Sequence, residues 1–561
     1  MRTRRWLFTG LSIFFISIVD AKDKPSVSLT PVRIRSILID PTNVFDPTVR
    51  GEDRWPFTWA NALHIRTHPN VIERELLVRP GDRAPLDLLE ESERNLRALP
   101  FIKSARITET PVRSGQVDLH VKTSDAWTTQ PQVNFNTEGG ESHSSIGMLE
   151  ENVLGYGKSL SYFYQKNSSH GSNHNFGYTD PQLLGTHARF STNLVDTPTG
   201  NEQHLNLSRP FYSLGTRYTA GSTWNHVLGE QSLSDRDVVI NRYMQDHQDV
   251  DGTAGVRINE DLNNVQRVIL QYKYRSDIYT AEATTVPGSL PQGRTITGPV
   301  IGWTLNQSDY IKETFADKAD RIEDINLGHQ TGLNLGYAGR SLGSTDSSLP
   351  LAAYDSIGIG HGTSNFALFY YGVSGRYNLY GPDQPRGQMI NTIYFANGNL
   401  YSHFPAPFPL TGVVHAETAY AQNADQNNLL ELGGNTGLRG YKVQSFTGNK
   451  SALMNLEGRF FYPKELAHLF YLGGATFFDA GEVQPQGAPF RRQDVHASIG
   501  MGLRIALTRS TEGSVFRLDV AYALGPVQQS NRIIVSLTAG QGFRRAGNSY
   551  QKFPGAVLQS Q

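Results

Sequence analysis

The feature that most limits how this chain can fold is a long series of short segments in which apolar and polar side chains alternate. The series runs from about residue 126 to Phe543, and clusters of Gly, Asn, Asp, Ser and Pro separate its segments. Alternation with a period of two is typical of β-strands that have one apolar and one polar face. Clear examples are residues 268–274, 499–507, 516–524 and 533–537.

Two kinds of β-fold share this alternation, a soluble sandwich and a membrane barrel. In a sandwich the polar face meets bulk water, whereas in a membrane barrel the apolar face meets lipid and the polar face lines a wet lumen. Arg517 and Asp519 stand beside the small residue Ala521 on one polar face, and the chain has 25 tyrosines and 27 phenylalanines. These features favour a transmembrane antiparallel β-barrel. At roughly ten residues per strand plus turns, residues 126–543 would hold about 16 strands.

The first residues indicate an exported protein. Three arginines within residues 2–5 precede an apolar stretch at 6–19, and Ala21 provides a small residue at which a signal peptidase could cut. Residues 1–21 are therefore predicted to be a signal peptide. The alternative, an anchored transmembrane helix, needs roughly 20 apolar residues, and this stretch is shorter. No later segment is continuously apolar over the length of a helical span, so any membrane insertion after export requires strands.

Several functional classes are not supported by the sequence. The chain has no cysteine, and 51 Lys and Arg are balanced by 52 Asp and Glu, so neither a disulfide scaffold nor a nucleic-acid partner is predicted. The segment Gly360-His361-Gly362-Thr363-Ser364 lacks the serine that a G-x-S-x-G elbow requires at its third position. A phosphate loop is not predicted either, because Asn152 stands where its first glycine would be required. The 16 histidines are scattered. We therefore expect no enzyme, no cofactor and no metal site.

Residues 22–125 are predicted to form a small α/β domain before the barrel. The patterns indicate elements in the order β-α-α-β-β. Residues 41–67 interrupt this domain as an irregular insertion that holds Trp55 and Trp59. We expect the insertion to pack either against the domain or against a partner. The predicted elements are a strand at 33–40, helices at 71–77 and 86–99, and strands at 104–110 and 115–122.

Several motifs together resemble the superfamily of BamA/TamA-type assembly proteins and two-partner secretion transporters. Residues 71–122 look like one polypeptide-transport-associated (POTRA) repeat. Gly433-Gly434-Asn435 leads into Leu438-Arg439-Gly440-Tyr441, which is similar to the VRGF/Y-type motif on a loop that folds back into the lumen. Phe477-Phe478-Asp479-Ala480-Gly481 is similar to the F-x-D-x-G strand motif.

The resemblance implies an architecture and a compartment. It implies a periplasmic POTRA-like domain at 22–125 and a barrel of the bacterial surface antigen type at 126–543, in the outer membrane of a Gram-negative bacterium. The last strand resembles a barrel-recognition signal that ends at Gln541-Gly542-Phe543. Residues 544–561 then form a tail, which returns to the periplasm or lumen or is disordered; its composition favours disorder.

The predicted site lies inside the barrel. A guanidinium on a lumen loop needs a partner, and the carboxylate of Asp479 can pair with Arg439 through two hydrogen bonds. The alternative is that these charges only solvate the lumen wall. The predicted site residues are Leu438, Arg439, Gly440 and Tyr441 of the loop motif, Phe477, Asp479 and Gly481 of the partner motif, and the lumen charges Glu457, Arg459, Arg517 and Asp519.

The resemblance further implies that the protein handles polypeptides, inserting barrel proteins into the outer membrane or translocating proteins across it. The partners would be unfolded outer-membrane or secreted polypeptides and outer-membrane lipid, with an accessory protein or a homodimer possible. A POTRA-like domain would bind clients by strand addition or act only as a spacer. The barrel seam is predicted near residues 128–136 and 532–543. The alternative function is a passive pore or a structural surface barrel.

Overall fold

The computed structural model describes most of residues 32–539. The gaps are residues 113–114, 139–140, 168–170, 236–237, 319, 362–364, 382–385, 406–408, 425–428, 444, 512–514 and 526–531. The predicted signal peptide, the predicted terminal signal at 541–543 and the tail at 544–561 lie outside the described residues.

Residues 32–125, here called the N-terminal unit, form a four-stranded mixed sheet and three helices. The strand order is β2-β1-β4-β3, with β1 parallel to β4 and β4 antiparallel to β3. The predicted strands and helices are present, and the insertion adds α1. The elements are β1 (Val32–Thr42), α1 (Phe57–Leu63), α2 (Pro69–Glu75), β2 (Arg83–Ala84), α3 (Leu86–Ala98), β3 (Ile102–Val112) and β4 (Gln116–Asp125).

One face of α3 packs on the sheet of the N-terminal unit. Leu89 and Leu96 lie seven residues apart on this face and are buried against the strands and α2. Ser92, between them, is also buried, and its hydroxyl donates to the carbonyl of Leu88 and accepts from the amide of Leu77. The polar residue is therefore tolerated because both of its hydrogen-bonding functions are satisfied.

The rest of the described chain forms a closed antiparallel barrel, with two small hairpins attached. Its strands follow one another in sequence order around the barrel, except where the hairpins intervene. The barrel strands are β5 (Thr129–Glu138), β6 (Glu141–Glu150), β7 (Ser159–Asn167), β8 (Gly171–Asp180), β9 (Arg189–Thr197), β10 (Gly200–Arg209), β11 (Tyr218–Asp235), β12 (Val238–Arg257), β13 (Asn264–Ala281), β14 (Arg294–Gln307), β17 (Gln330–Gly336), β18 (Ser347–His361), β19 (Asn365–Tyr380), β20 (Met389–Pro405), β21 (Pro409–Gln422), β24 (Lys450–Phe461), β25 (Phe470–Gln484), β26 (His496–Leu507), β27 (Val515–Ala523) and β28 (Ile533–Ala539).

The barrel has more strands than the sequence predicted. Among the described residues it contains 20 strands, so the expectation of about 16 was too low. The six strands β5–β10 have only nine or ten residues each, and all of them lie between residues 129 and 209. The estimate had assumed one long loop for each pair of strands, and this first part of the barrel uses less chain per strand. None of the helices in the described part of the chain is long and apolar enough to cross a membrane.

The two faces of the barrel wall differ in polarity. On β26 and β27 the apolar side chains Met501 and Leu518 point outward and are exposed, whereas Arg504 and Asp519 point inward and are buried. The same division holds for β13, where Leu270 and Tyr272 are exposed. An apolar outer face and a polar inner face are the distribution of a barrel whose wall meets lipid.

The barrel closes between its first and last strands. Within the described residues, β28 and β5 pair at Leu537 and Thr137. The contact falls close to the predicted seam.

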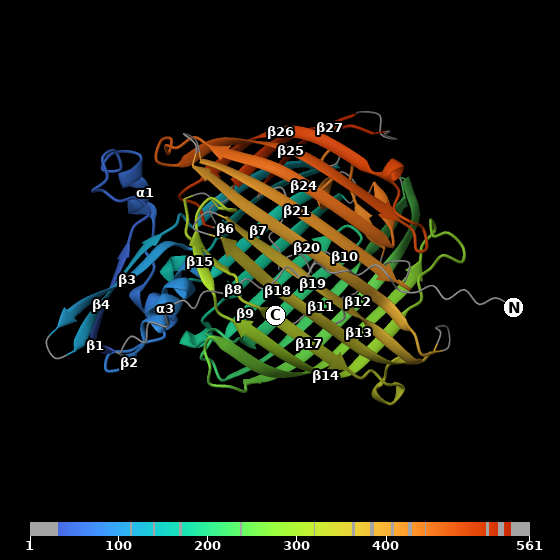
Figure 1. The fold of residues 1–561 in the computed structure, drawn as a ribbon, viewed down its shortest axis with the longest axis horizontal. Coiled ribbons are helices and arrows are strands. Elements are labelled where there is room, and N and C mark those ends of the chain that lie inside the picture. Colours follow the sequence, from blue (N-terminus) through green and yellow to red (C-terminus); the bar gives the residue numbers. More distant parts are fainter. Residues whose placement is uncertain are drawn as a thin grey trace.

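The N-terminal unit covers one end of the barrel, here called the near mouth (Figure 1). Its helices α2 and α3 face the barrel. The Glu75 carboxylate accepts a hydrogen bond of 2.6 Å from Gln182 in the turn before β9, and Glu91 accepts one of 2.6 Å from the amide of Leu214. On the opposite side of the mouth, Arg509 donates to Glu52 over 2.8 Å. The unit is therefore attached at several points around the rim.

A buried carboxylate joins the unit to the first barrel strands. Asp125, at the end of β4, is fully buried and accepts hydrogen bonds from the amide and hydroxyl of Thr67, at 2.8 and 3.0 Å. The hydroxyl of Thr67 in turn accepts a hydrogen bond from Asn152, in the turn between β6 and β7. Burial raises the pKa of Asp125 to about 6, although Thr67 and Arg66 act in the opposite direction. Nε2 of His64 lies 3.8 Å from the Asp125 carboxylate, and burial lowers the pKa of this histidine.

This junction should respond to pH. Because the folded state raises the pKa of Asp125, its contribution to stability is fully present below the unfolded value near 3.8 and is lost as the pH rises through about 6. The loss would amount to at most about 3 kcal/mol. We expect the wild-type junction to resist limited proteolysis better at pH 5 than at pH 8. Asp125→Asn, which stays uncharged, should lose this difference. An equal pH response in both proteins would contradict the assignment.

Candidate functional site

The predicted loop motif lies on the long connection between β21 and β24. This connection forms a small hairpin, β22 (Leu430–Leu432) with β23 (Phe446–Gly448), and the motif lies between its strands. A short helical turn at Gly434–Thr436 begins where the amide of Gly433 donates to the Thr436 hydroxyl at 2.7 Å. Gly437 follows with a φ of 115°, a conformation that favours glycine. The turn directs Arg439 toward the barrel wall.

Arg439 is buried between two carboxylates of the inner wall, with 2% of its surface exposed. Its Nε and Nη2 donate to the two oxygens of Asp479 at 3.0 and 2.7 Å, and Nη1 donates to Glu457 at 2.5 Å. The guanidinium also lies 3.5 Å from the ring centroid of Phe477. The amide of Arg439 donates to Asp479 as well, at 3.2 Å. One arginine therefore ties the loop to β24 and β25 through charge-assisted hydrogen bonds.

The two carboxylates belong to a larger buried charge network. Glu457 accepts from Arg459 at 2.8 Å and lies 3.6 Å from Arg504 on β26. Arg504 donates to Asp519 of β27 at 2.5 Å, and Arg517 donates to the other oxygen of Asp519 at 2.8 Å. The network thus extends across β24, β25, β26 and β27. Each carboxylate has a guanidinium partner, which offsets the cost of burying the charges.

The other motif residues fit the loop against the wall. Leu438 is fully buried in a cluster with Leu432, Leu453 and Ala523. Gly440 lies so close to β26 that a Cβ atom there would be 2.5 Å from the Cβ of Ser498. The hydroxyl of Tyr441 donates to the carbonyl of Ala497 at 3.2 Å, and its ring meets His496 edge-on at 5.5 Å.

Gly481 and the lumen charges complete the predicted set. A Cβ on Gly481 would lie 2.8 Å from the side chain of Leu432, so this glycine allows the hairpin to approach β25. Phe477, Asp479, Glu457, Arg459, Arg517 and Asp519 are all buried on the inner face. The structure therefore brings together the residues that the sequence selected.

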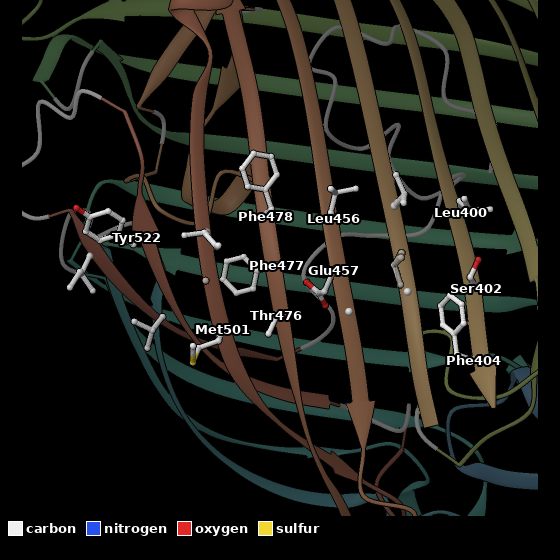
Figure 2. A pocket seen from close by; sticks show the side chains of 18 residues that line it. Leu400, Ser402, Phe404, Leu456, Glu457, Thr476, Phe477, Phe478, Met501 and Tyr522 are labelled. Atoms are coloured by element: carbon white, nitrogen blue, oxygen red, sulfur yellow. The ribbon is translucent and has the colours of Figure 1, made fainter. Parts of the chain in front are cut away.

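The outer side of the same wall is apolar. Leu400, Phe404, Leu456, Phe478 and Met501 border a shallow hollow that crosses β20, β21 and β24–β26 (Figure 2). Gly412 and Gly458 also line it. The charge network and an apolar lipid-facing surface are thus separated by the thickness of one sheet.

A hairpin that the sequence did not predict reaches the network from the near mouth. Its strands are β15 (Tyr310–Glu313) and β16 (Glu323–Asn326), between β14 and β17. At its tip, the carbonyl of Ala316 accepts a hydrogen bond of 2.8 Å from Arg459, and Asp317 lies 3.6 Å from the same guanidinium. The carboxylate of Glu323 accepts hydrogen bonds from the backbone amides of residues 316–318, which fixes the conformation of the tip.

The base of this hairpin is held by the N-terminal unit. Arg97 of α3 donates to both oxygens of Asp324, each at 2.8 Å, and both side chains are largely buried. Arg94 lies over the ring of Tyr310 at 4.2 Å. A continuous series of polar contacts therefore runs from α3 through the hairpin to Arg459, Glu457 and the loop motif.

Some site residues were missed by sequence analysis. Ser498 and Arg504 occupy inner positions of β26, where the period-two pattern places even-numbered residues, and this signal could have identified them. Asp317 and Asp324 had no comparable signal, because strands of four residues are too short to show a period. In the described part of the chain, no group of three or more His, Asp or Glu side chains is arranged to hold a metal ion.

Among solved structures, the chain is similar to BamA and CdiB proteins. BamA from Haemophilus ducreyi lacking POTRA domains 1–3 matches at 14% identity, over 91% of this chain and 84% of that chain, with a TM-score of 0.35. CdiB from Acinetobacter baumannii matches at 12% identity over 91% and 74%, with a TM-score of 0.44. CdiB from Escherichia coli matches at 11% identity over 91% and 76%, with a TM-score of 0.46.

No family model matches the chain, and no curated protein matches it. The solved structures that the chain resembles are BamA and CdiB proteins, and the similarity is one of fold.

Removal of the loop arginine should destabilise the barrel. Arg439→Ala leaves Asp479 and Glu457 buried with one partner fewer, and breaking such a pair typically costs about 3–5 kcal/mol. We expect a lower unfolding midpoint in urea and faster cleavage of the loop by protease. The matched control is Arg491→Ala, at an exposed position in the connection between β25 and β26. It should leave the unfolding midpoint and the rate of loop cleavage unchanged. Equal stability of the two variants would mean that the ion pairs do not hold the loop.

The close contact at Gly440 gives a second prediction. Gly440→Ala should displace the loop, because the new Cβ would overlap that of Ser498. Ser498→Gly removes the opposing atom, so the double variant should recover part of the lost protease resistance of the loop. If Ser498→Gly gives no recovery, the contact with β26 is not what requires a glycine at position 440.

Proposed function

We propose that this protein handles unfolded polypeptides at the outer membrane of a Gram-negative bacterium, inserting barrel proteins into it or moving proteins across it. The N-terminal unit would act as a single POTRA-like domain on the periplasmic side. The observation that carries the proposal is that the barrel closes between its first and last strands, at Leu537 and Thr137, beside a lumen loop that Arg439 holds to the wall.

A seam between the first and last strands suits this function for a physical reason. Unpaired backbone groups are costly in lipid, so a strand that enters the membrane needs a partner edge. Opening the seam at Leu537 and Thr137 would expose two such edges. An incoming strand could then pair with β5 or β28 before it meets lipid. The charge network would keep the adjacent strands β24–β27 in place during this opening.

The N-terminal unit offers a second edge. Strand β3 pairs with β4 on one side, and the other side carries polar contacts from α3. The amide of Ile107 donates to Glu93 at 2.7 Å, and the carbonyl of Ala105 accepts from Arg97 at 3.4 Å. A client strand that adds to β3 would take over these hydrogen bonds, since strand addition uses the same backbone groups.

Arg97 would connect this edge with the barrel interior. The same guanidinium binds Glu93, the edge carbonyl and Asp324 of the hairpin. Client binding at β3 would therefore disturb the hairpin base, and the hairpin tip contacts Arg459 in the charge network. We infer a route by which an occupied N-terminal unit loosens the loop motif. In this mechanism the loop is a movable element rather than a fixed part of the wall.

A disulfide across the seam tests the proposal directly, because the chain has no cysteine of its own. Thr137→Cys with Leu537→Cys places two thiols on paired residues, where antiparallel strands are close enough for a disulfide. We expect the oxidised variant to stay in the membrane and to lose client assembly, with recovery after reduction. Val520→Cys with Val535→Cys, across the paired β27 and β28, is the control and should remain active. Full activity of the oxidised seam variant would refute lateral opening.

The clients can be identified by depletion of the protein in its native host and comparison of the outer-membrane and secreted proteomes. Loss of particular barrels or exported proteins, restored by the wild type but not by Arg439→Ala, would support client handling. Deletion of residues 22–125 should have the same effect. Unchanged proteomes with altered solute permeability would instead indicate a passive pore.

A further inference from the structure

The insertion at residues 41–67 carries a helix whose polar face is turned inward. On α1, Asn61 points into the unit, where its side chain donates to the carbonyl of Phe45 at 2.8 Å and accepts from its amide at 3.1 Å. Phe57, four residues earlier, packs on Phe45 at 4.7 Å. Trp59 and Leu63 lie on the opposite face, because they follow these residues by two positions.

The outward face of α1 is apolar and uncovered. Trp59 is 61% exposed and Leu63 is 56% exposed, and the flanking residues Trp55 and Ile65 are 78% and 51% exposed. Large apolar side chains grouped on the surface indicate a binding surface, whereas isolated ones do not. We refer to Trp55, Trp59, Leu63 and Ile65 as the α1 stripe.

The insertion is fixed to the rim of the barrel, beneath one part of its wall. Phe57 meets the ring of His468 at 5.7 Å, in the turn between β24 and β25, and Glu52 binds Arg509 in the turn after β26. At the end of β24 and in the same connection, the side chains of Phe460, Tyr462 and Leu469 are exposed. Figure 1 shows α1 to the left of the strands β24–β27, at the end of the molecule that the N-terminal unit occupies. The α1 stripe is therefore held close to where the lipid-facing surface ends.

We propose that the α1 stripe is a membrane anchor, which inserts into the headgroup layer of the leaflet next to the N-terminal unit. Tryptophan is the side chain that prefers this layer, since its ring is apolar and its N–H can reach water. The nearby Arg54 is exposed and could contact lipid phosphates. The anchor would set the height and tilt of the N-terminal unit beside strands β24–β28. This proposal requires a barrel in a bilayer, and it is independent of polypeptide transport.

Site-specific labelling of the full chain tests the proposal, because single cysteines can be introduced into a protein without any. A fluorescent label is placed at Leu63→Cys in the α1 stripe, at Thr108→Cys on an exposed position of β3, and at Met501→Cys on the outer face of the barrel. Each protein is reconstituted in phosphatidylcholine vesicles with and without bromine on the acyl chains near the headgroup. Bromine quenches only a label that contacts lipid.

We expect bromine to quench the labels at positions 63 and 501 several-fold more than the label at position 108. Replacing Trp55 and Trp59 by Ser in the Leu63→Cys protein should reduce quenching there and leave position 501 unaffected. Quenching at 501 but not at 63 would overturn the anchor and retain the membrane barrel. If an unfolded barrel polypeptide then shifts the emission at 63, the stripe is a polypeptide surface. Absence of quenching at both positions would overturn the anchor and the membrane barrel together.

Discussion

The constraint on which the whole barrel depends is that each strand needs a hydrogen-bonded neighbour on both sides. In lipid no water is available to replace a missing partner, so the sheet must close on itself. Nearly every pair of neighbouring strands meets this requirement with seven or more paired residues. Strand β17 has two of the shorter ladders, one with β14 and one with β18. In the described part of the chain, β28 and β5 pair at Leu537 and Thr137 and so complete the ring of strands. The sheet therefore closes on itself.

The second constraint concerns buried charge. A guanidinium or carboxylate inside a protein is tolerated only when it is paired, and breaking one pair leaves its partner uncompensated. Glu457 has contacts with Arg439, Arg459 and Arg504, so the loop and the wall share one carboxylate, which the hairpin reaches through Arg459. Displacing the loop would take Arg439 away from Glu457 and Asp479 and leave each carboxylate with one guanidinium partner fewer. The network therefore couples the loop, the wall and the hairpin as well as stabilising them.

Sequence reasoning succeeded where a pattern was long or a motif was specific. Period-two alternation identified strands such as β26 and β27, and the loop motif singled out Arg439 and Asp479. It failed where the elements were short or depended on distant parts of the chain. The hairpin β15–β16 has strands of four residues, and its contacts with Arg97 and Arg459 join residues far apart in the sequence. Helix α1 was missed because its seven residues are too few to show a helical period.

The distribution of charge around the barrel is related to the position of the seam. The network occupies the inner faces of β24–β27, on one side of the seam. On the other side, the inner face of β7–β9 carries neutral residues such as Ser161 and Asn193, which flank Gly177. One side is thus held by ionic contacts between strands, and the other by backbone hydrogen bonds with small polar side chains. If the seam opens, the edges that it exposes are β5 and β28, and β28 stays paired with β27, whose inner face belongs to the charge network.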